Sequence, residues 1–336
     1  RGLGDVYKRQ IYGNVGGGTM NVSQNFTQNN GAYMAQNGTL NIAGILTMSG
    51  IFGRENGIVN FNGIGPQSIP ALAYNRLLIA GSGRLITLSP GEIRIFGATA
   101  GFVPHASNFY TTIGNTIHFD RSGNQEVQGF NYNNLTVSRT GVKSMVANAS
   151  VRSTLQVGNN TTFDADGASN NRVVTLLSNQ ASTARIAPLS TGASIVGNMN
   201  IQRWTRGGIR SNRFLGSPVD TTNGITFRQL RDNVITLGPG GAANGFDNPT
   251  VFTSNLSVFN EELANGSEWR SPANINEIIP RGKGLILFHL GDRSQVSTAH
   301  TTFPNQATID FKGVPNQGDI NLPIQCTGVC IEADNG

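Results

Sequence analysis

Short stretches in which apolar and polar positions alternate recur along the first half of the chain. The clearest apolar pairs, each two positions apart, are Leu40 with Ile42, Leu77 with Ile79, and Leu135 with Val137. A period of two is typical of β-strands that bury one face. Glycine and asparagine separate these stretches, and both residues favour turns. The pattern therefore predicts many short strands joined by tight turns.

Two segments of this region align with each other without a gap. Residues 59–69 lie over residues 117–127, and in the same register residues 74–83 lie over residues 132–141. The identical pairs are Phe61 and Phe119, Gly65 and Gly123, Gln67 and Gln125, Tyr74 and Tyr132, Asn75 and Asn133, Leu77 and Leu135, and Gly83 and Gly141. Because chance rarely preserves so many residues in one register, the two segments form an internal repeat.

A shorter repeat lies upstream. Met20-Asn21-Val22 recurs as Leu40-Asn41-Ile42, and Phe26-Thr27 recurs as Leu46-Thr47. Three such units come close to the longer period, so each unit has the length of one coil of a parallel β-helix, or β-solenoid. Stacked coils would pair at ~4.8 Å, and glycine and asparagine would supply the left-handed backbone angles of the corners. The same two residues can also serve the hairpins of a β-sandwich, which is the alternative architecture.

The repeat also predicts which side chains the coils bury. Equivalent side chains of a solenoid point the same way and stack in columns. We expect the buried set to be Phe61, Leu77, Ile79, Phe119, Leu135 and Val137. We expect the solvent-facing set to be Asn60, Arg76, His118, Asn134 and Thr136.

The pattern changes after about residue 185. Strands without a repeat are predicted at 195–204, 250–252, 257–260, 284–290 and 308–311, with a glycine-rich loop at 238–247. Their uneven spacing favours a separate β-sandwich. We therefore expect an all-β chain with a solenoid over residues 11–185 and a jelly-roll-like sandwich over residues 190–336, and a boundary near 185–195. Residues 1–10 resemble spurious translation and are excluded from the fold. The sandwich is expected to be truncated at its C-terminal end.

Composition narrows the classes of protein. Charged residues make up 13% of the chain, against a usual ~25%, which is too few for the solvated faces of a helical bundle or coiled coil. No apolar stretch approaches the ~20 residues of a membrane span. The net charge of +5 comes mostly from scattered arginines, whereas a nucleic-acid binder gathers basic and aromatic residues on one face. One local cluster, Arg203 to Arg213 around Trp204, is either a charged strand edge or a patch for anions and acidic glycans.

Metal and cofactor chemistry is not indicated. Cys326 and Cys330 favour a small disulfide loop over a zinc site, because zinc would require histidines from elsewhere. The four histidines, at positions 105, 118, 289 and 300, show no metal-ligand spacing. Gly282-Lys283-Gly284 lacks the spacing of a phosphate-binding loop and is interpreted as a tight turn. We expect no metal and no cofactor.

Carboxylates are the residues that a polysaccharide lyase or hydrolase would need on one face of a β-solenoid. Asp120 and Glu126 share a repeat, but the earlier repeat has Asn62 and Ser68 at those positions. No row of carboxylates therefore forms along the coils. The segment 164–167 resembles a calcium loop only in its first ligands and is interpreted as a turn. We expect no catalytic residue.

Two groups of residues resemble large secreted and cell-surface proteins of the Bacteroidetes. Residues 61–77, followed by Gly81-Ser82-Gly83, are similar to repeats of those proteins. The stretches similar to the jelly-roll-like module that follows such repeats are 197–204, 213–219, 244–247, 282–288 and 291–294. The resemblance covers about residues 15–330. It implies a surface or extracellular location, export by the type IX secretion system and no known catalytic residues. Trp204 is a departure, since such modules often carry tyrosine there.

From these observations we expect a non-enzymatic secreted or cell-surface protein of structural or adhesin type, whose sandwich binds extracellular glycan or a surface protein. The candidate ligand-binding residues are Trp204, Phe246 and Trp269, because aromatic rings combine a large apolar face with specific geometry. The alternative is a polysaccharide-degrading β-helix enzyme, a lyase or hydrolase, or its carbohydrate-binding accessory region.

Overall fold

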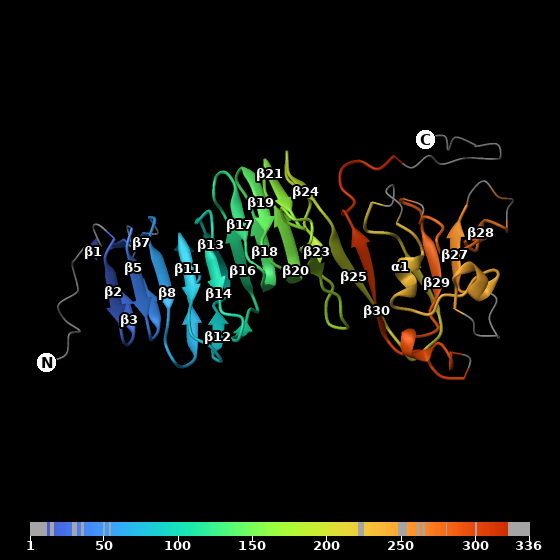
Figure 1. The fold of residues 1–336 in the computed structure, drawn as a ribbon, viewed down its shortest axis with the longest axis horizontal. Coiled ribbons are helices and arrows are strands. Elements are labelled where there is room, and N and C mark those ends of the chain that lie inside the picture. Colours follow the sequence, from blue (N-terminus) through green and yellow to red (C-terminus); the bar gives the residue numbers. More distant parts are fainter. Residues whose placement is uncertain are drawn as a thin grey trace, which may run out of the picture. The chain divides into compact units, whose positions relative to one another are not determined.

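The chain folds as an all-β protein in two compact units (Figure 1). The computed structural model describes residues 12–13, 17–28, 32–34, 37–49, 51–53, 55–220, 225–247, 254–260, 263, 266–279, 281–299 and 301–321. Unit 1 runs to Leu176 and includes residues 184–197, whereas unit 2 contains residues 177–183 and the chain from Asn198 onward. Residues 1–10 and both cysteines, Cys326 and Cys330, lie outside the described residues.

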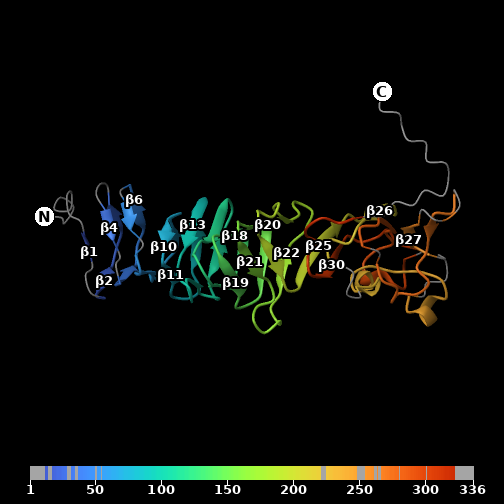
Figure 2. The same cartoon turned by 90° about the horizontal axis from the view of Figure 1, so that it is seen from above.

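Unit 1 contains a β-solenoid of about seven turns over residues ~19–164. Its strands pair in parallel and lie side by side in successive coils (Figures 1 and 2). One sheet has the order β14 (Phe102–Pro104), β11 (Arg76–Ile79), β8 (Ile58–Phe61), β5 (Thr39–Ile42), β2 (Thr19–Val22). A second has the order β10 (Ala73–Tyr74), β13 (Gly91–Ile95), β16 (Asn115–Phe119), β18 (Asn131–Val137), β20 (Ala149–Val157), β22 (Val174–Leu176), and β23 (Arg185–Ile186) also pairs with β20.

Shorter strands build the other faces of the coils. One group is β1 (Tyr12–Gly13), β4 (Ala32–Met34) and β7 (Ile51–Gly53), and β3 (Phe26–Gln28) pairs with β6 (Leu46–Met48). A further group is β9 (Gln67–Ile69), β12 (Leu85–Leu88) and β15 (Phe109–Thr111). The last is β17 (Gln125–Val127), β19 (Gly141–Met145), β21 (Thr161–Asp164) and β24 (Ser194–Val196).

The strand register confirms both repeats. Between β2 and β5, Met20 pairs with Leu40 and Asn21 with Asn41, as the shorter repeat predicts. Between β8 and β11 the partner of Phe61 is Ile79. In the second copy of the longer repeat, between β16 and β18, the partner of Phe119 is Val137. Phe61 and Phe119 are therefore equivalent in their pairing, although they stand in different sheets and so in separate columns.

The predicted burial of the repeat is also confirmed. The side chains predicted to face inward are at most 1% exposed, and they are Phe61, Leu77, Ile79, Phe119, Leu135 and Val137. The set predicted to face solvent is instead half-buried, and four of its five side chains bond to neighbouring coils. Asn41 donates from Nδ2 to Asn21 Oδ1 at 2.7 Å, and Asn60 donates to Asn41 Oδ1 at 2.9 Å. Asparagine thus joins coils on the outer face as well as forming corners.

The repeated glutamine and tyrosine close the corners of the coils. Gln67 donates from Nε2 to the carbonyl oxygens of residues 42 and 44 in the preceding coil, and Gln125 does the same to residues 95 and 97. Tyr74 donates its hydroxyl to the carbonyl oxygen four residues earlier, and Tyr132 repeats that bond. Buried carbonyl groups need such partners, which explains why these two residue types recur.

Unit 2 is built from antiparallel strands. β25 (Met199–Thr205) pairs with β30 (Ala307–Gly313), and a four-stranded sheet has the order β26 (Asn212–Leu215), β29 (Leu285–Phe288), β27 (Leu256–Phe259), β28 (Trp269–Arg270). Helix α1 (Arg228–Arg231) and two short 3₁₀ turns, η2 (Gly241–Asn244) and η3 (Arg293–Gln295), complete the described elements. The arrangement confirms an all-β unit but does not establish a jelly roll, which has eight strands in two Greek keys.

One predicted strand is wrong in its extent. Residues 195–204 form two strands, β24 and β25, instead of one. Gly197 separates them with a backbone φ of +81°, and a Cβ there would lie 2.0 Å from Asp166 Oδ1. Because only glycine tolerates both conditions, the chain breaks its alternation at this point. The strand expected at 250–252 lies outside the described residues.

Candidate functional site

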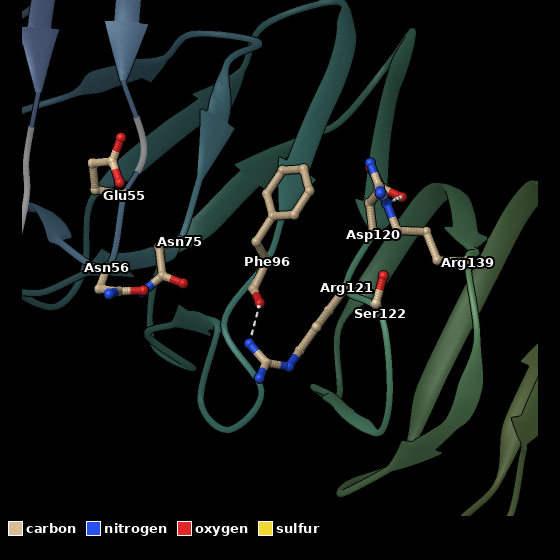
Figure 3. Close-up of a pocket in the computed structure, with 8 residues that line it drawn as sticks. All are labelled: Glu55, Asn56, Asn75, Phe96, Asp120, Arg121, Ser122 and Arg139. Carbon is tan, nitrogen blue, oxygen red and sulfur yellow. Dashed lines mark hydrogen bonds and ion pairs between the residues drawn. The ribbon is translucent and has the colours of Figure 1, made fainter.

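A polar pocket opens on unit 1 (Figure 3). It has a volume of about 270 Å³, and its lining residues are Glu55, Asn56, Asn75, Phe96, Asp120, Arg121, Ser122 and Arg139. Each comes from a bend or a strand end: the turn before β8, the junction of β10 and β11, the end of β13, the corner after β16 and the corner after β18. Parallel stacking brings these corners together although they are far apart in the sequence.

Asp120 is the buried anion of this pocket. Its carboxylate forms ion pairs with Arg94 and with Arg139, whose Nε lies 2.7 Å from Oδ1. The Ser138 hydroxyl donates to the same Oδ1 at 2.8 Å. Burial alone would raise the pKa of Asp120, but the hydrogen bonds from Arg139 and Ser138 and the nearby charge of His118 outweigh it and lower that pKa. The carboxylate is therefore held ionised and fully paired.

A chain of hydrogen bonds extends from Asp120 across the face of the solenoid. His118 Nδ1 lies 2.5 Å from Glu92 Oε1, and His118 Nε2 lies 2.6 Å from Ser138 Oγ. The order carboxylate, imidazole, hydroxyl is that of a nucleophilic serine site. However, the single hydroxyl proton of Ser138 is donated to Asp120, so His118 faces Ser138 as a donor. The imidazole is then not placed to remove the serine proton, and the chain links coils instead of activating a nucleophile.

Four other polar side chains of the lining have no partner among the described residues. The side chains of Glu55, Asn56, Asn75 and Ser122 make no hydrogen bond or ion pair within the part of the chain that the structure describes. Among the described residues the Arg121 side chain donates one hydrogen bond, from Nη1 to the Phe96 carbonyl oxygen at 3.3 Å (Figure 3). The ring of Phe96 is itself flanked by guanidinium groups, those of Arg94 at 5.6 Å and Arg139 at 5.8 Å. The pocket thus offers free donors and acceptors beside one paired carboxylate.

The three aromatic residues proposed from the sequence do not lie together. Trp204 is half-buried on β25. Phe246 is 1% exposed and belongs to the core of unit 2, so it presents no ring to solvent. Trp269, on the edge strand β28, is 43% exposed. It contacts Phe259 at a ring-centroid distance of 5.2 Å and Phe214 at 6.5 Å, both edge to face.

Sequence reasoning missed most of this pocket and the aromatic group around Trp269. For the pocket a signal did exist, because Asp120, Arg121 and Arg139 replace Asn62, Gly63 and Gly81 of the earlier repeat. For the aromatic group the signal was strand alternation. Once β26 and β27 are assigned as strands, their alternation places Phe214 and Phe259 on the outer side of the sheet.

The other candidates from the sequence lie at strand ends and turns. Lys283, between two glycines, leads into strand β29 and not into a helix. Residues 164–167 form the end of β21 and a turn at Gly167, which has a φ of +68°. Among the described residues no three histidine, cysteine or acidic side chains are grouped so that they could hold a metal ion. None of the described helices has the length and apolar character needed to span a membrane.

Comparison of the chain with family models, with curated proteins and with solved structures finds no match.

Proposed function

We propose that the chain is a non-enzymatic structural and adhesion protein of the cell exterior, in which the solenoid is a spacer and unit 2 binds glycan. The observation that carries this proposal is an aromatic group made of the exposed Phe214 and Trp269 and the half-buried Phe259, named here the aromatic face. Phe214 is 75% exposed and Trp269 is 43% exposed. Exposed apolar groups of this kind on a soluble domain mark interaction sites more often than stability.

The aromatic face follows from strand alternation in the sheet of β26, β29, β27 and β28. Inward positions carry the buried Leu256, Val258, Leu285 and Leu287. Outward positions bring Phe214 opposite Ile286 on β29, and Phe259 opposite Trp269 on β28. Three rings therefore cover one side of a sheet whose other side is core.

The chemistry of the aromatic face suits a sugar chain. A sugar ring presents a C–H face that can pack on an aromatic ring and hydroxyl groups that remain hydrated at the rim. Rings held edge to face by their neighbours, as Trp269 is, lose little side-chain freedom on binding.

Two further observations support the non-enzymatic and extracellular parts of the proposal. Asp120, the most buried carboxylate at the pocket, is neutralised by two arginines and is not free to act as an acid or base. The resemblance of the repeats and of the second half to Bacteroidetes surface proteins supports a surface location and export by type IX secretion. The scattered positive charge favours no nucleic-acid partner.

The test is binding of the protein to immobilised polysaccharides, compared between wild type and Trp269→Ala. We expect at least a tenfold loss of binding, because the variant removes the central ring of the aromatic face. Phe303→Ala is the matched control, since Phe303 is 79% exposed but lies outside the aromatic face. Wild-type binding that Trp269→Ala leaves unchanged, or no binding to any polysaccharide, would contradict the proposed function.

A further inference from the structure

We propose that the polar pocket of unit 1 is a second binding site, which takes an acidic sugar: one hexuronate unit, with its carboxylate on Arg121 and its hydroxyls on Glu55, Asn56, Asn75 and Ser122. This site lies in the solenoid, outside the aromatic face, and does not depend on the function proposed for unit 2.

The corner after β16 carries charged residues that its counterpart in the earlier repeat lacks. The corner after β16 and the corresponding corner after β8 have the same backbone arrangement, since Gln125 Oε1 accepts from the Arg121 N–H at 3.3 Å as Gln67 Oε1 accepts from the Gly63 N–H at 3.2 Å. The earlier corner is built with Asn62 and Gly63. The charged side chains at 120 and 121 are therefore additions that the corner itself does not require.

Two residues of the pocket hold a strained backbone conformation. Arg139 has a φ of +76°, almost that of its repeat equivalent Gly81 at +80°. Glu55 also has a positive φ, of +29°. Such angles are costly for any residue with a Cβ, and residues held in them gather at functional sites. Two of the five non-glycine residues with positive φ in the described chain line this one pocket.

The charges within the pocket are not all paired with one another. Asp120 engages Arg94 and Arg139, so these two guanidinium groups already have a carboxylate partner. Arg121 has none among the described residues, and its exposed guanidinium keeps donors free beyond the one bond to the Phe96 carbonyl oxygen. A planar guanidinium presents paired donors that match a carboxylate. Arg121 is therefore the cation available to an anionic ligand.

The remaining lining groups define the rest of the ligand. Glu55 repels a second anion but accepts hydrogen bonds from hydroxyl groups, and Asn56, Asn75 and Ser122 can both donate and accept. The ligand is thus anionic at one end and hydroxylated at the other. The volume of about 270 Å³ lies at the small end of ligand pockets, which commonly measure ~300–1,000 Å³, and suits one sugar ring.

The experiment is calorimetric or NMR titration of the folded chain with D-glucuronate, D-glucose and acetate at low ionic strength. We expect glucuronate to bind at least tenfold more tightly than either of the other two, since glucose lacks the anion and acetate lacks the hydroxyls. Arg121→Gln should weaken glucuronate binding at least tenfold. Arg152→Gln is the matched control, because Arg152 is an exposed arginine of the solenoid outside the pocket, and it should bind like wild type.

Three outcomes would overturn the proposal: equal binding of glucuronate and acetate, equal binding of glucuronate and glucose, or an Arg121→Gln variant that binds as wild type does. Circular dichroism confirms that each variant is folded. Trp269→Ala separates the two proposals, because it should abolish polysaccharide binding by the aromatic face and leave glucuronate binding to the pocket intact.

Discussion

Lys143 is an inward-facing lysine that closes one corner of the coils. It pairs in register with Gln125 on the preceding strand and is completely buried. Its Nζ donates to the carbonyl oxygens of Arg121 at 2.5 Å and Gly123 at 2.7 Å, the bonds that glutamine supplies in other coils. Burial lowers the pKa of Lys143 to about 8, and the positive Arg121 and Arg139 act in the same direction against the attraction of Asp120.

This amine should make stability rise with pH. As pH increases above about 8 the folded state releases the proton of Lys143, whereas the unfolded chain holds it until about 10.5. Since the unfolded state then binds more protons, the free energy of unfolding increases through that window. We expect a gain on the order of 1 kcal/mol between pH 7 and pH 9, measured by denaturant titration.

In the Lys143→Met variant the same gain should disappear, whereas Lys312→Met, at an exposed position, should keep it. The stability measurements stop at pH 9 because tyrosines ionise above that pH. Burial raises the pKa of Tyr74 and Tyr132, and their ionisation in the unfolded chain lowers stability only from about pH 10 upward. An equal slope in wild type and Lys143→Met would show that this amine is not the group responsible.

At the scale of the strand, stability is set by the inward columns. Phe119 is fully buried between Ile95 and Val137 in adjacent strands, and its ring meets Tyr132 edge to face at 6.4 Å. Phe119→Ala should therefore cost ~3–5 kcal/mol of unfolding free energy, the range for emptying an aromatic site in a packed core. Urea denaturation measures the loss.

Asn134→Ala is the control, because Asn134 precedes the buried Leu135 on the same strand and belongs to the outward set. Asn134 is half-buried and donates one side-chain hydrogen bond, to the Asn115 carbonyl oxygen at 3.3 Å. Its loss should cost only ~0.5–1.5 kcal/mol. If Asn134→Ala unfolded the protein while Phe119→Ala were neutral, the inward and outward phase of these strands would be reversed.

The sequence was sufficient for the solenoid but not for its interior polar groups. A period of two decides which side chains point inward, so Phe61 and Phe119 could be placed from the repeat alone. Lys143 could not be placed in this way, because lysine is rarely buried. Its inward position is explained only by the two carbonyl oxygens that its amine reaches. The pocket escaped prediction for a related reason, since its lining side chains come from five corners that only the stacking brings together.

At the scale of the whole molecule, the contacts divide the chain at 176/177, 183/184 and 197/198. The sequence predicts a boundary near 185–195, and limited proteolysis tests it. We expect early cleavage within 187–193, a strand-free and partly exposed segment between β23 and β24. The cut leaves β24, a strand of unit 1, joined to the chain of unit 2. Two protease-resistant pieces should still remain, because each unit keeps its own core. A single core that resists cleavage as one piece would refute the two-domain interpretation.

The parallel pairing of unit 1 has a mechanical consequence. Backbone hydrogen bonds between coils lie along the axis on which the coils stack. A tensile load along that axis is therefore carried by all the interfaces in series, and the interfaces break one after another. Each released coil frees a segment like that between the paired Met20 and Leu40, and such a segment extends by roughly 65 Å at ~3.3 Å per residue. Under traction the solenoid would lengthen in steps and dissipate work at each one. A fold with this response yields gradually under load, where a single cooperative domain would give way at once.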